Sequence, residues 1–298
     1  MSLRTCDSLT LRSESEMSSN KRAVSRRAFL SGGAAASAYF WIPKPVRGYT
    51  PAEMRAMVVD GQMTPGVSKW DLDTPALCLE LDKFERNIQT MQAAMKKFGI
   101  ESRPHAKTHK CAAIAKHQMA TGSIGICCAK PSEAEALAAE GLDKILMTTA
   151  NVPKNKIRRA MNLRKAHPHF IQAVDYAPNA RDLDAAAKET GLVAEVVIDV
   201  AVGSRTGIPP GEDALTLAQL IDKLPNLKLL GMLSYDGGAQ HAIGFENRKA
   251  RALKNIAANT EVFQMMKKAG LNTEILAIYF IQVTPRCCGL GITAFERT

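Results

Sequence analysis

The strongest structural signal in this sequence is the octapeptide Arg103-Pro104-His105-Ala106-Lys107-Thr108-His109-Lys110. It follows an extended run and precedes a helix-like segment. A lysine at the junction of a strand and a loop can attack an aldehyde and form a Schiff base, the chemistry by which enzymes hold an aldehyde cofactor. Lys107 therefore makes pyridoxal phosphate the first hypothesis for a cofactor.

Four cationic or titratable residues of this octapeptide are spaced two positions apart. If residues 101–109 are extended, alternate side chains lie on one face. That face would carry Arg103, His105, Lys107 and His109. Such a face is costly in an apolar core, so we expect it to line a wet, anion-binding mouth. An ordinary solvated loop is the alternative, whereas one shared metal ion is disfavoured because strand residues four apart are separated by about 13 Å.

The rest of the chain alternates short apolar runs with helical segments. Strands are predicted at 75–81, 101–107, 124–129, 144–149, 170–174, 194–200, 228–235 and 273–283. Amphipathic helices are predicted between them, for example at 82–97 and 246–269. Strict alternation predicts a parallel sheet, and this many units favours a (β/α) barrel of the α/β class. A doubly wound sheet is the alternative, although no G-x-G-x-x-G turn follows the first strand.

Two further strand ends carry polar residues. The strand at 194–200 runs into a glycine-punctuated loop with Arg205, which could bind an anion or pair with Asp199. The strand at 228–235 ends in Tyr235, followed by Asp236 and then two glycines that would let a ligand approach the backbone. Barrel active sites are built at the carboxyl ends of the strands, so we expect these clusters to converge.

Composition excludes some other functions. The formal net charge of the 298 residues is +10, and half of it lies in residues 1–48, which hold eight Lys/Arg against three acids. The remaining charge is spread out without interleaved aromatics, which argues against nucleic-acid binding. The seven cysteines show neither a disulfide framework nor a C-x-x-C pair.

The N-terminus is predicted to be a targeting signal. Ser25-Arg26-Arg27-Ala28-Phe29-Leu30 has the form of a twin-arginine signal, and an apolar run of about fifteen residues follows it. We therefore expect a disordered signal region at 1–48, a linker at 49–72, and export through the twin-arginine machinery to the periplasm. A retained anchor is an alternative to cleavage of the signal.

These motifs together resemble the fold-type III pyridoxal-phosphate enzymes, in particular the D-threonine aldolase and D-serine dehydratase family. The likeness runs from about residue 70 to 275 and is carried by residues 73–77, 103–110, 125–135 and 205–207. It implies a TIM-type (β/α)8 barrel over 73–283, similar to the alanine racemase N-terminal domain. It also implies that Lys107 is the catalytic, cofactor-linked residue, with His105, Arg205 and Tyr235 binding the cofactor.

The sequence departs from this family near its end. The family has a glycine- and threonine-rich phosphate-binding turn and then a β-rich C-terminal domain with a zinc site. Residues 284–298 instead contain an Arg-Cys-Cys run. No zinc ligands can be assigned here, so we expect an irregular tail, a missing C-terminal β domain and a truncated reading frame. The barrel would then be incomplete, one strand short, with an unpaired edge.

By this resemblance the chain would be a pyridoxal-phosphate-dependent lyase acting on D-3-hydroxy amino acids, of the D-threonine aldolase or D-serine dehydratase type. Truncation could leave it inactive. A non-catalytic pyridoxal-phosphate-binding protein and an amino-acid racemase are the alternatives. The expected partners are a small D-amino acid substrate and a second copy in a homodimer.

Overall fold

The computed structural model describes residues 58–59, 62–63, 75, 77–202, 206–280 and 292–296. The predicted signal region at 1–48 lies outside these residues, as does most of the predicted linker. The chain divides into two compact units, one of residues 7–85 and one containing residues 86–298. The first contains a short antiparallel pair, β1 (Val58–Val59) with β2 (Gln62–Met63).

The second unit contains the main sheet and its helices. Its strands are β3 (Glu101–Ser102), β4 (Ile126–Cys128), β5 (Ile145–Met147), β6 (Ile171–Val174), β7 (Ala194–Asp199), β8 (Leu227–Asp236), β9 (Ile275–Phe280) and β10 (Ile292–Glu296). The α-helices among the described residues are α3 (Leu81–Lys97), α4 (Ala112–Ala120), α5 (Pro131–Ala139), α6 (Lys154–Ala166), α7 (Ala177–Glu189), α8 (Glu212–Lys223) and α9 (Phe245–Lys268). Two 3-10 turns, η4 (Ala106–Thr108) and η5 (Ala239–His241), follow β3 and β8. None of the helices among the described residues is long and apolar enough to cross a bilayer.

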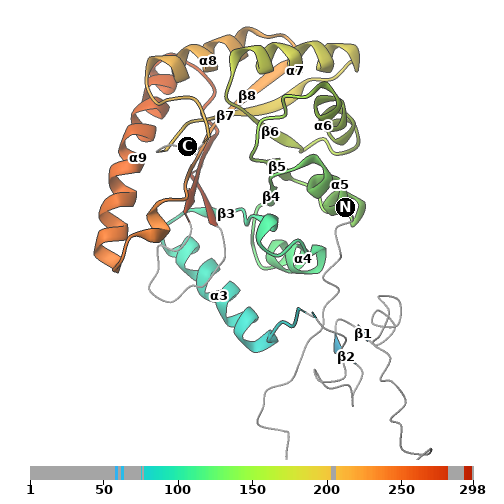
Figure 1. The fold of residues 1–298 in the computed structure, drawn as a ribbon, viewed down its shortest axis with the longest axis vertical. Coiled ribbons are helices and arrows are strands. Elements are labelled where there is room, and N and C mark those ends of the chain that lie inside the picture. The colour runs from blue at the N-terminus through green and yellow to red at the C-terminus, as the bar shows by residue number, and fades with distance from the viewer. Residues whose placement is uncertain are drawn as a thin grey trace, which may run out of the picture. The chain divides into compact units, whose positions relative to one another are not determined.

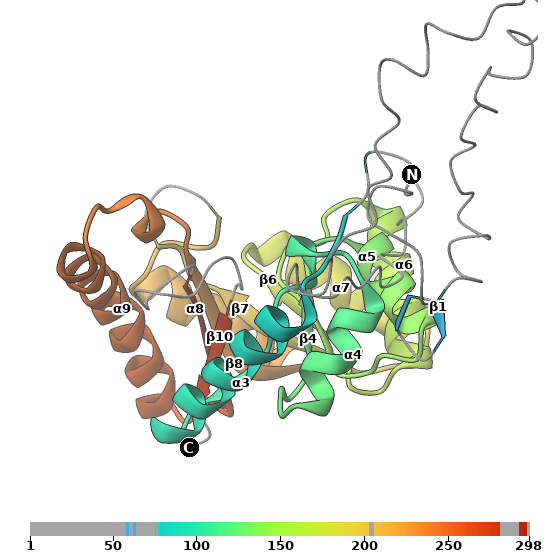
Figure 2. The same cartoon turned by 90° about the horizontal axis from the view of Figure 1, so that it is seen from below.

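The sheet has the topology of a TIM-type barrel. Its strand order is β3-β10-β9-β8-β7-β6-β5-β4, and β4 to β9 pair in parallel. A parallel bridge between His105 and Cys127 joins the end of β3 to β4. Figure 1 shows α4 to α9 following one another around the outside of the strands, and Figure 2 shows them flanking the strands from a second direction. The predicted (β/α) barrel is confirmed and the doubly wound alternative is wrong.

The barrel does not consist of eight parallel strands, because β10 lies between β3 and β9 and runs in the opposite direction. It pairs antiparallel with both β9 and β3. The expectation of an unpaired edge after β9 is therefore corrected, as is that of irregular structure throughout 284–298. Pairing with two neighbours satisfies backbone groups that an open edge would leave to solvent.

Two apolar layers follow from the alternation of side chains along the strands. Residues such as Ile126, Met147 and Ile198 face the helices and form one core cluster. The intervening residues form a second, inner cluster that includes Cys127, Leu146, Ala173, Val197, Leu233 and Ala277. Because the inner cluster is apolar, it closes the barrel interior beneath the carboxyl ends of the strands.

Strand β8 contains a bulge that reverses its alternation. The register against β7 shifts at this point, with Val196 opposite Leu229 and Val197 opposite Gly231. Leu230 belongs to the inner cluster, as do Leu233 and Tyr235 three and five residues later. Without the extra residue, strict period two would turn Tyr235 outward. Gly231 has φ +136°, and a Cβ there would run into the carbonyl group of Ile275 on β9.

We expect Gly231→Ala to lower the free energy of unfolding by about 3 kcal/mol or more, because it combines a forbidden φ with a backbone clash. Urea denaturation measures this change. Gly191→Ala is the matched control, since Gly191 also has a positive φ, +66°, but open space around its Cβ position. It should cost only about 1 kcal/mol. Equal losses in the two variants would contradict the role of the close approach to β9.

Candidate active site

The extended segment that begins at β3 ends at His105, earlier than the sequence predicts. The His105 Nδ1 accepts the backbone N–H of Lys107 at 3.2 Å and so caps the 3-10 turn η4. Lys110, with φ +52°, then donates its N–H to the Ala106 carbonyl at 2.7 Å. The predicted single face of alternating side chains is therefore wrong beyond His105, because a local side-chain cap replaces the extended backbone.

Arg103 is not at the predicted anion-binding mouth. Its Nη1 donates at 2.5 Å to the carbonyl of Lys144, the residue that precedes β5. A Cβ at Gly125 would collide with both groups, so this glycine lets the guanidinium pass close to the backbone. Arg103 thus ties together the amino ends of the strands, at the opposite end of the barrel from η4.

The structure brings Lys107 and Tyr235 together at the carboxyl ends of β3 and β8. The Lys107 Nζ lies 5.0 Å from the centroid of the Tyr235 ring, within cation–π distance. Both side chains are partly buried. Residues 128 positions apart in the sequence therefore place an amine and an aromatic ring side by side at the mouth of the barrel.

His105 stands behind this pair in a fixed, neutral form. Burial lowers its pKa to about 3, with smaller contributions from the nearby Lys107 and His109. Because Nδ1 accepts the Lys107 N–H, the proton of the neutral ring is on Nε2, which donates to Thr148 Oγ1 at 3.1 Å. The Thr148 hydroxyl in turn donates to the Cys128 carbonyl at 3.2 Å. This chain fixes the orientation of the imidazole and, through it, the backbone of Lys107.

His109 has a related structural role at the start of α4. Its Nδ1 accepts the N–H of Cys111, the residue before the helix, at 3.1 Å. Burial lowers the pKa of His109 to about 4. Both histidines of the octapeptide are therefore neutral at pH 7 and hold the backbone on either side of Lys107.

The Arg205 prediction lies outside the described residues. The loop rejoins the described chain at Thr206, and Ile208 pairs with Val200 at the end of β7. A Cβ at Gly207, where φ is +101°, would lie 2.6 Å from the Ala201 nitrogen. Only glycine allows this return past the strand end.

Sequence reasoning missed two contributors to the site. Thr148 holds His105, and the only available signal was a threonine at the end of an apolar strand. The carboxylate of Asp236 accepts hydrogen bonds from the turn after Tyr235 and from Asn255 on α9. Asp236 stood in the quoted strand-end cluster, but its partner is nineteen positions away and gave no local pattern.

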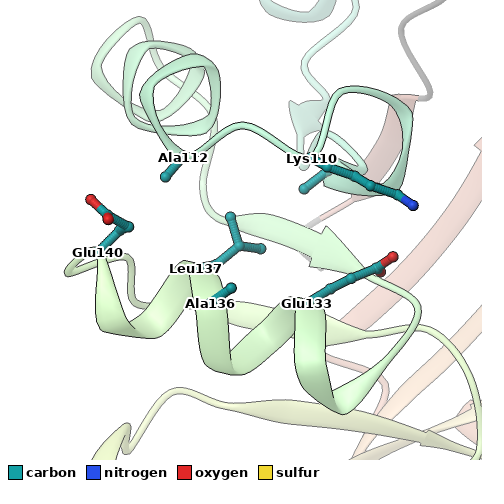
Figure 3. A pocket seen from close by; sticks show the side chains of 7 residues that line it. Lys110, Ala112, Glu133, Ala136, Leu137 and Glu140 are labelled. Carbon is teal, nitrogen blue, oxygen red and sulfur yellow. The ribbon is translucent and has the colours of Figure 1, made fainter. Parts of the chain in front are cut away.

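A separate small pocket lies behind η4, on the helix side of the barrel. It is lined by Ala106, Lys110, Ala112, Glu133, Ala136, Leu137 and Glu140. Figure 3 shows Leu137 and Ala136 on its α5 wall and the side chains of Lys110 and Glu133 extending toward the same end. Neither Lys107 nor Tyr235 lines it, so it is distinct from the candidate active site at the barrel mouth.

No group of three or more His, Cys, Asp or Glu within reach of a common metal ion occurs in the part of the chain that the structure describes. The four cysteines described there, at positions 78, 111, 127 and 128, form no disulfide bond. Burial raises the pKa of the Cys128 thiol, so this residue is an inert core side chain.

Residues 79–279 match the family described as alanine racemase, N-terminal domain, and the chain belongs to this family. Members of known structure that it resembles are fold-type III pyridoxal-phosphate enzymes. This agrees with the resemblance drawn from the octapeptide.

Individual relatives are lyases. The chain is 35% identical over 215 residues to a 3-hydroxy-D-aspartate aldolase of Paracoccus denitrificans (strain Pd 1222), covering 72% of this chain and 56% of the relative. It is 33% identical to a D-threonine aldolase of Arthrobacter sp., covering 73% and 58%. A D-threo-3-hydroxyaspartate dehydratase of Delftia sp. (strain HT23) is 31% identical, covering 70% and 55%. The chain thus spans a little over half the length of these relatives.

Solved structures agree with this assignment. The crystal structure of D-threonine aldolase from Filomicrobium marinum superposes with a TM-score of 0.68 at 36% identity, covering 70% of this chain and 56% of that one. Alanine racemase of Clostridium difficile 630 gives a TM-score of 0.56 at 18% identity, covering 66% and 53%, which supports the fold alone.

The buried neutral histidines predict a specific loss of stability in acid. The ordinary pKa of 6.5 applies to the unfolded chain, so His105 takes up a proton there as pH falls below 6.5 but resists protonation in the folded state down to about 3. The neutral His105 ring therefore contributes its full stabilisation above pH 6.5. As the pH falls from 6.5 towards 3, the free energy of unfolding decreases by about 1.4 kcal/mol per pH unit. His109 has a pKa of about 4 in the folded state, so unfolding takes up a second proton over most of the same pH range.

We expect His105→Asn to reduce the pH dependence of the unfolding free energy by about one proton between roughly pH 4 and 6. Asparagine keeps an acceptor for the Lys107 N–H without a titrating ring. In the double variant that also carries His109→Asn, the pH dependence of the unfolding free energy should fall by about two protons. Urea denaturation at a series of pH values measures both slopes, and an unchanged slope in His105→Asn would show that this ring is not held neutral.

Proposed function

We propose that this chain forms the cofactor-binding barrel of a pyridoxal-phosphate-dependent lyase that acts on D-3-hydroxy amino acids. The observation that carries the proposal is the Lys107 amine, held 5.0 Å from the Tyr235 ring at the carboxyl ends of the strands. The aldolases and the dehydratase among its relatives support the reaction class.

The residues at the barrel mouth fit the cofactor. Lys107 offers a nucleophilic amine, and Tyr235 offers an aromatic face beside it. His105 is neutral and adds no competing charge next to the amine. Below them, the apolar inner cluster gives a dry floor for a flat heteroaromatic ring. When bound, pyridoxal phosphate supplies an aldehyde for the amine and an electron sink for a carbanion at the substrate Cα.

The side chains of this chain have distinct tasks in the proposed reaction. Lys107 Nζ holds the cofactor and is placed to hold or deliver a proton at that end of the site. Tyr235 restricts the position of the amine through its ring. His105 and Thr148 keep the turn that carries Lys107 rigid.

Aldol cleavage is the reaction we propose first, because both aldolases are more similar to this chain than the dehydratase is. In that reaction the β-hydroxyl loses its proton, the Cα–Cβ bond breaks to release an aldehyde, and Cα takes up a proton to give glycine. Dehydration instead removes the Cα proton and the β-hydroxyl, and leads to a 2-oxo acid and ammonia. Product analysis with D-threonine and 3-hydroxy-D-aspartate separates the two.

Export by the twin-arginine machinery is a further proposal, supported by the Ser25–Leu30 motif and the apolar run behind it. That route carries folded proteins, which suits an enzyme that takes up its cofactor before export. A homodimer stays a prediction from the family resemblance.

The test of the cofactor site is covalent trapping at Lys107. After incubation with pyridoxal phosphate and reduction with borohydride, peptide mapping should find the reduced cofactor on Lys107. Lys107→Arg keeps the charge but removes the nucleophile, so trapping should disappear and any lyase activity should fall by roughly 10³-fold or more. Lys116→Ala, an exposed lysine on α4, is the matched control and should retain both properties.

Trapping spread over several surface lysines and unchanged in Lys107→Arg would refute the cofactor site. Specific trapping without glycine, aldehyde or 2-oxo acid from either substrate would instead indicate a cofactor-binding protein that is not a lyase.

A further inference from the structure

The turn after β8 is held by a buried carboxylate. Asp236 is 3% exposed, and its Oδ1 accepts the backbone N–H groups of Gly238 at 2.9 Å and Ala239 at 3.0 Å. Its Oδ2 accepts the side-chain amide of Asn255, on α9, at 2.7 Å. Three donors satisfy the carboxylate and tie the end of β8 both to its own turn and to a helix.

Gly237 lies directly against the ring of Tyr235. A Cβ at position 237 would be 2.8 Å from both Cε1 and the hydroxyl oxygen of Tyr235, closer than real Cβ contacts allow. The backbone at Gly237 therefore forms one side of the space that the ring occupies. The ring also lies beside the Lys107 amine.

We propose that Asp236, Asn255 and Gly237 act together as a clasp that positions the Tyr235 ring over the Lys107 amine. The Asp236 carboxylate fixes the backbone of the turn, and the lack of a side chain at Gly237 leaves room for the Tyr235 ring. These three are positioning residues that act through Tyr235. This inference rests on the proposed function for its catalytic consequence, but the geometry of the clasp can be tested without it.

The alternation of β8 supports a positioning role for Asp236. Tyr235 packs against the inner cluster, and Asp236, the next residue, bonds to α9 on the outside of the barrel. Its side chain thus faces away from the Lys107 amine. A buried carboxylate that accepts three hydrogen bonds is suited to hold a turn, whereas a general acid or base needs access to the substrate.

A double-mutant cycle tests the clasp directly. In cofactor-free protein, the rate of reductive methylation of Lys107, followed by peptide mass spectrometry, reports how closely the ring covers the amine. We expect Gly237→Ala, Asp236→Ala and Tyr235→Ala each to raise this rate roughly three- to tenfold, because each displaces or removes the ring. In the Tyr235→Ala background, Gly237→Ala and Asp236→Ala should add nothing further.

Conservative variants separate positioning from catalysis. In Asp236→Asn the side-chain oxygen still accepts from the two backbone N–H groups, and the Asn255 amide can rotate to present its own oxygen. We therefore expect Asp236→Asn to restore the wild-type methylation rate, cofactor affinity and kcat, whereas Asp236→Ala should retain cofactor about tenfold less tightly. Loss of kcat in Asp236→Asn at saturating cofactor, with a normal methylation rate, would overturn the positioning role.

Asn255→Ala is a milder variant in case Asp236→Ala fails to fold, since the carboxylate keeps its two backbone donors. It should raise the methylation rate in the same direction, again only while Tyr235 is present. Asn247→Ala is the matched control on the same helix, because the Asn247 amide donates to Ile243 instead. It should leave the rate unchanged.

The outcomes for the clasp and for the proposed function are separate. If the wild-type protein takes up no cofactor at Lys107, the proposed function fails, while the methylation cycle still reports on the clasp. If Gly237→Ala and Asp236→Ala accelerate methylation equally with and without Tyr235, the clasp is refuted even when trapping and turnover succeed.

Discussion

One extra residue in β8 determines which side chains of that strand reach the interior of the barrel. The bulge around Gly231 reverses the alternation, so that Leu230 and Leu233 both point inward and Tyr235 follows them. The same step sends Asp236 outward, where it bonds to α9. A glycine is required because the bulged backbone passes against β9 with φ +136°. The site on β8 therefore depends on a backbone irregularity in the middle of the strand, about 13 Å along the strand from Tyr235.

The other half of the site depends on stopping β3 early. Once the extended backbone ends at His105, a 3-10 turn carries Lys107. The turn is held by the neutral His105 ring, which accepts the Lys107 N–H on one nitrogen and donates to Thr148 from the other. An imidazolium could not accept that bond, and it would be buried beside a lysine. Burial and local bonding thus favour the same protonation state, which is why the turn and the low pKa of His105 belong together.

The sequence predicted the repeating parts of this structure well and the local exceptions poorly. Apolar runs and amphipathic stretches placed the helix at 82–97 and the strands from 101 to 283 close to their observed positions, because both depend on simple periods. The bulge, the 3-10 turn and strand β10 break or lack such periods. For the site, Lys107 and Tyr235 were recognisable as polar residues at strand ends. Thr148 and the bond between Asp236 and Asn255 were not, since they depend on contacts between distant segments.

In an enzyme that uses a cofactor, the protein contributes binding and position, and the cofactor contributes the reactive electronics. The Lys107 amine, its aromatic neighbour and the bonds that hold both lie within one barrel unit, which spans a little over half the length of the related lyases. In the proposed function, cofactor capture depends on these local contacts. Choice of substrate would depend on the groups around the side chain of the amino acid, and the related aldolases are named for different substrates, 3-hydroxy-D-aspartate and D-threonine. Capture of the proposed cofactor can therefore be measured on this barrel independently of turnover.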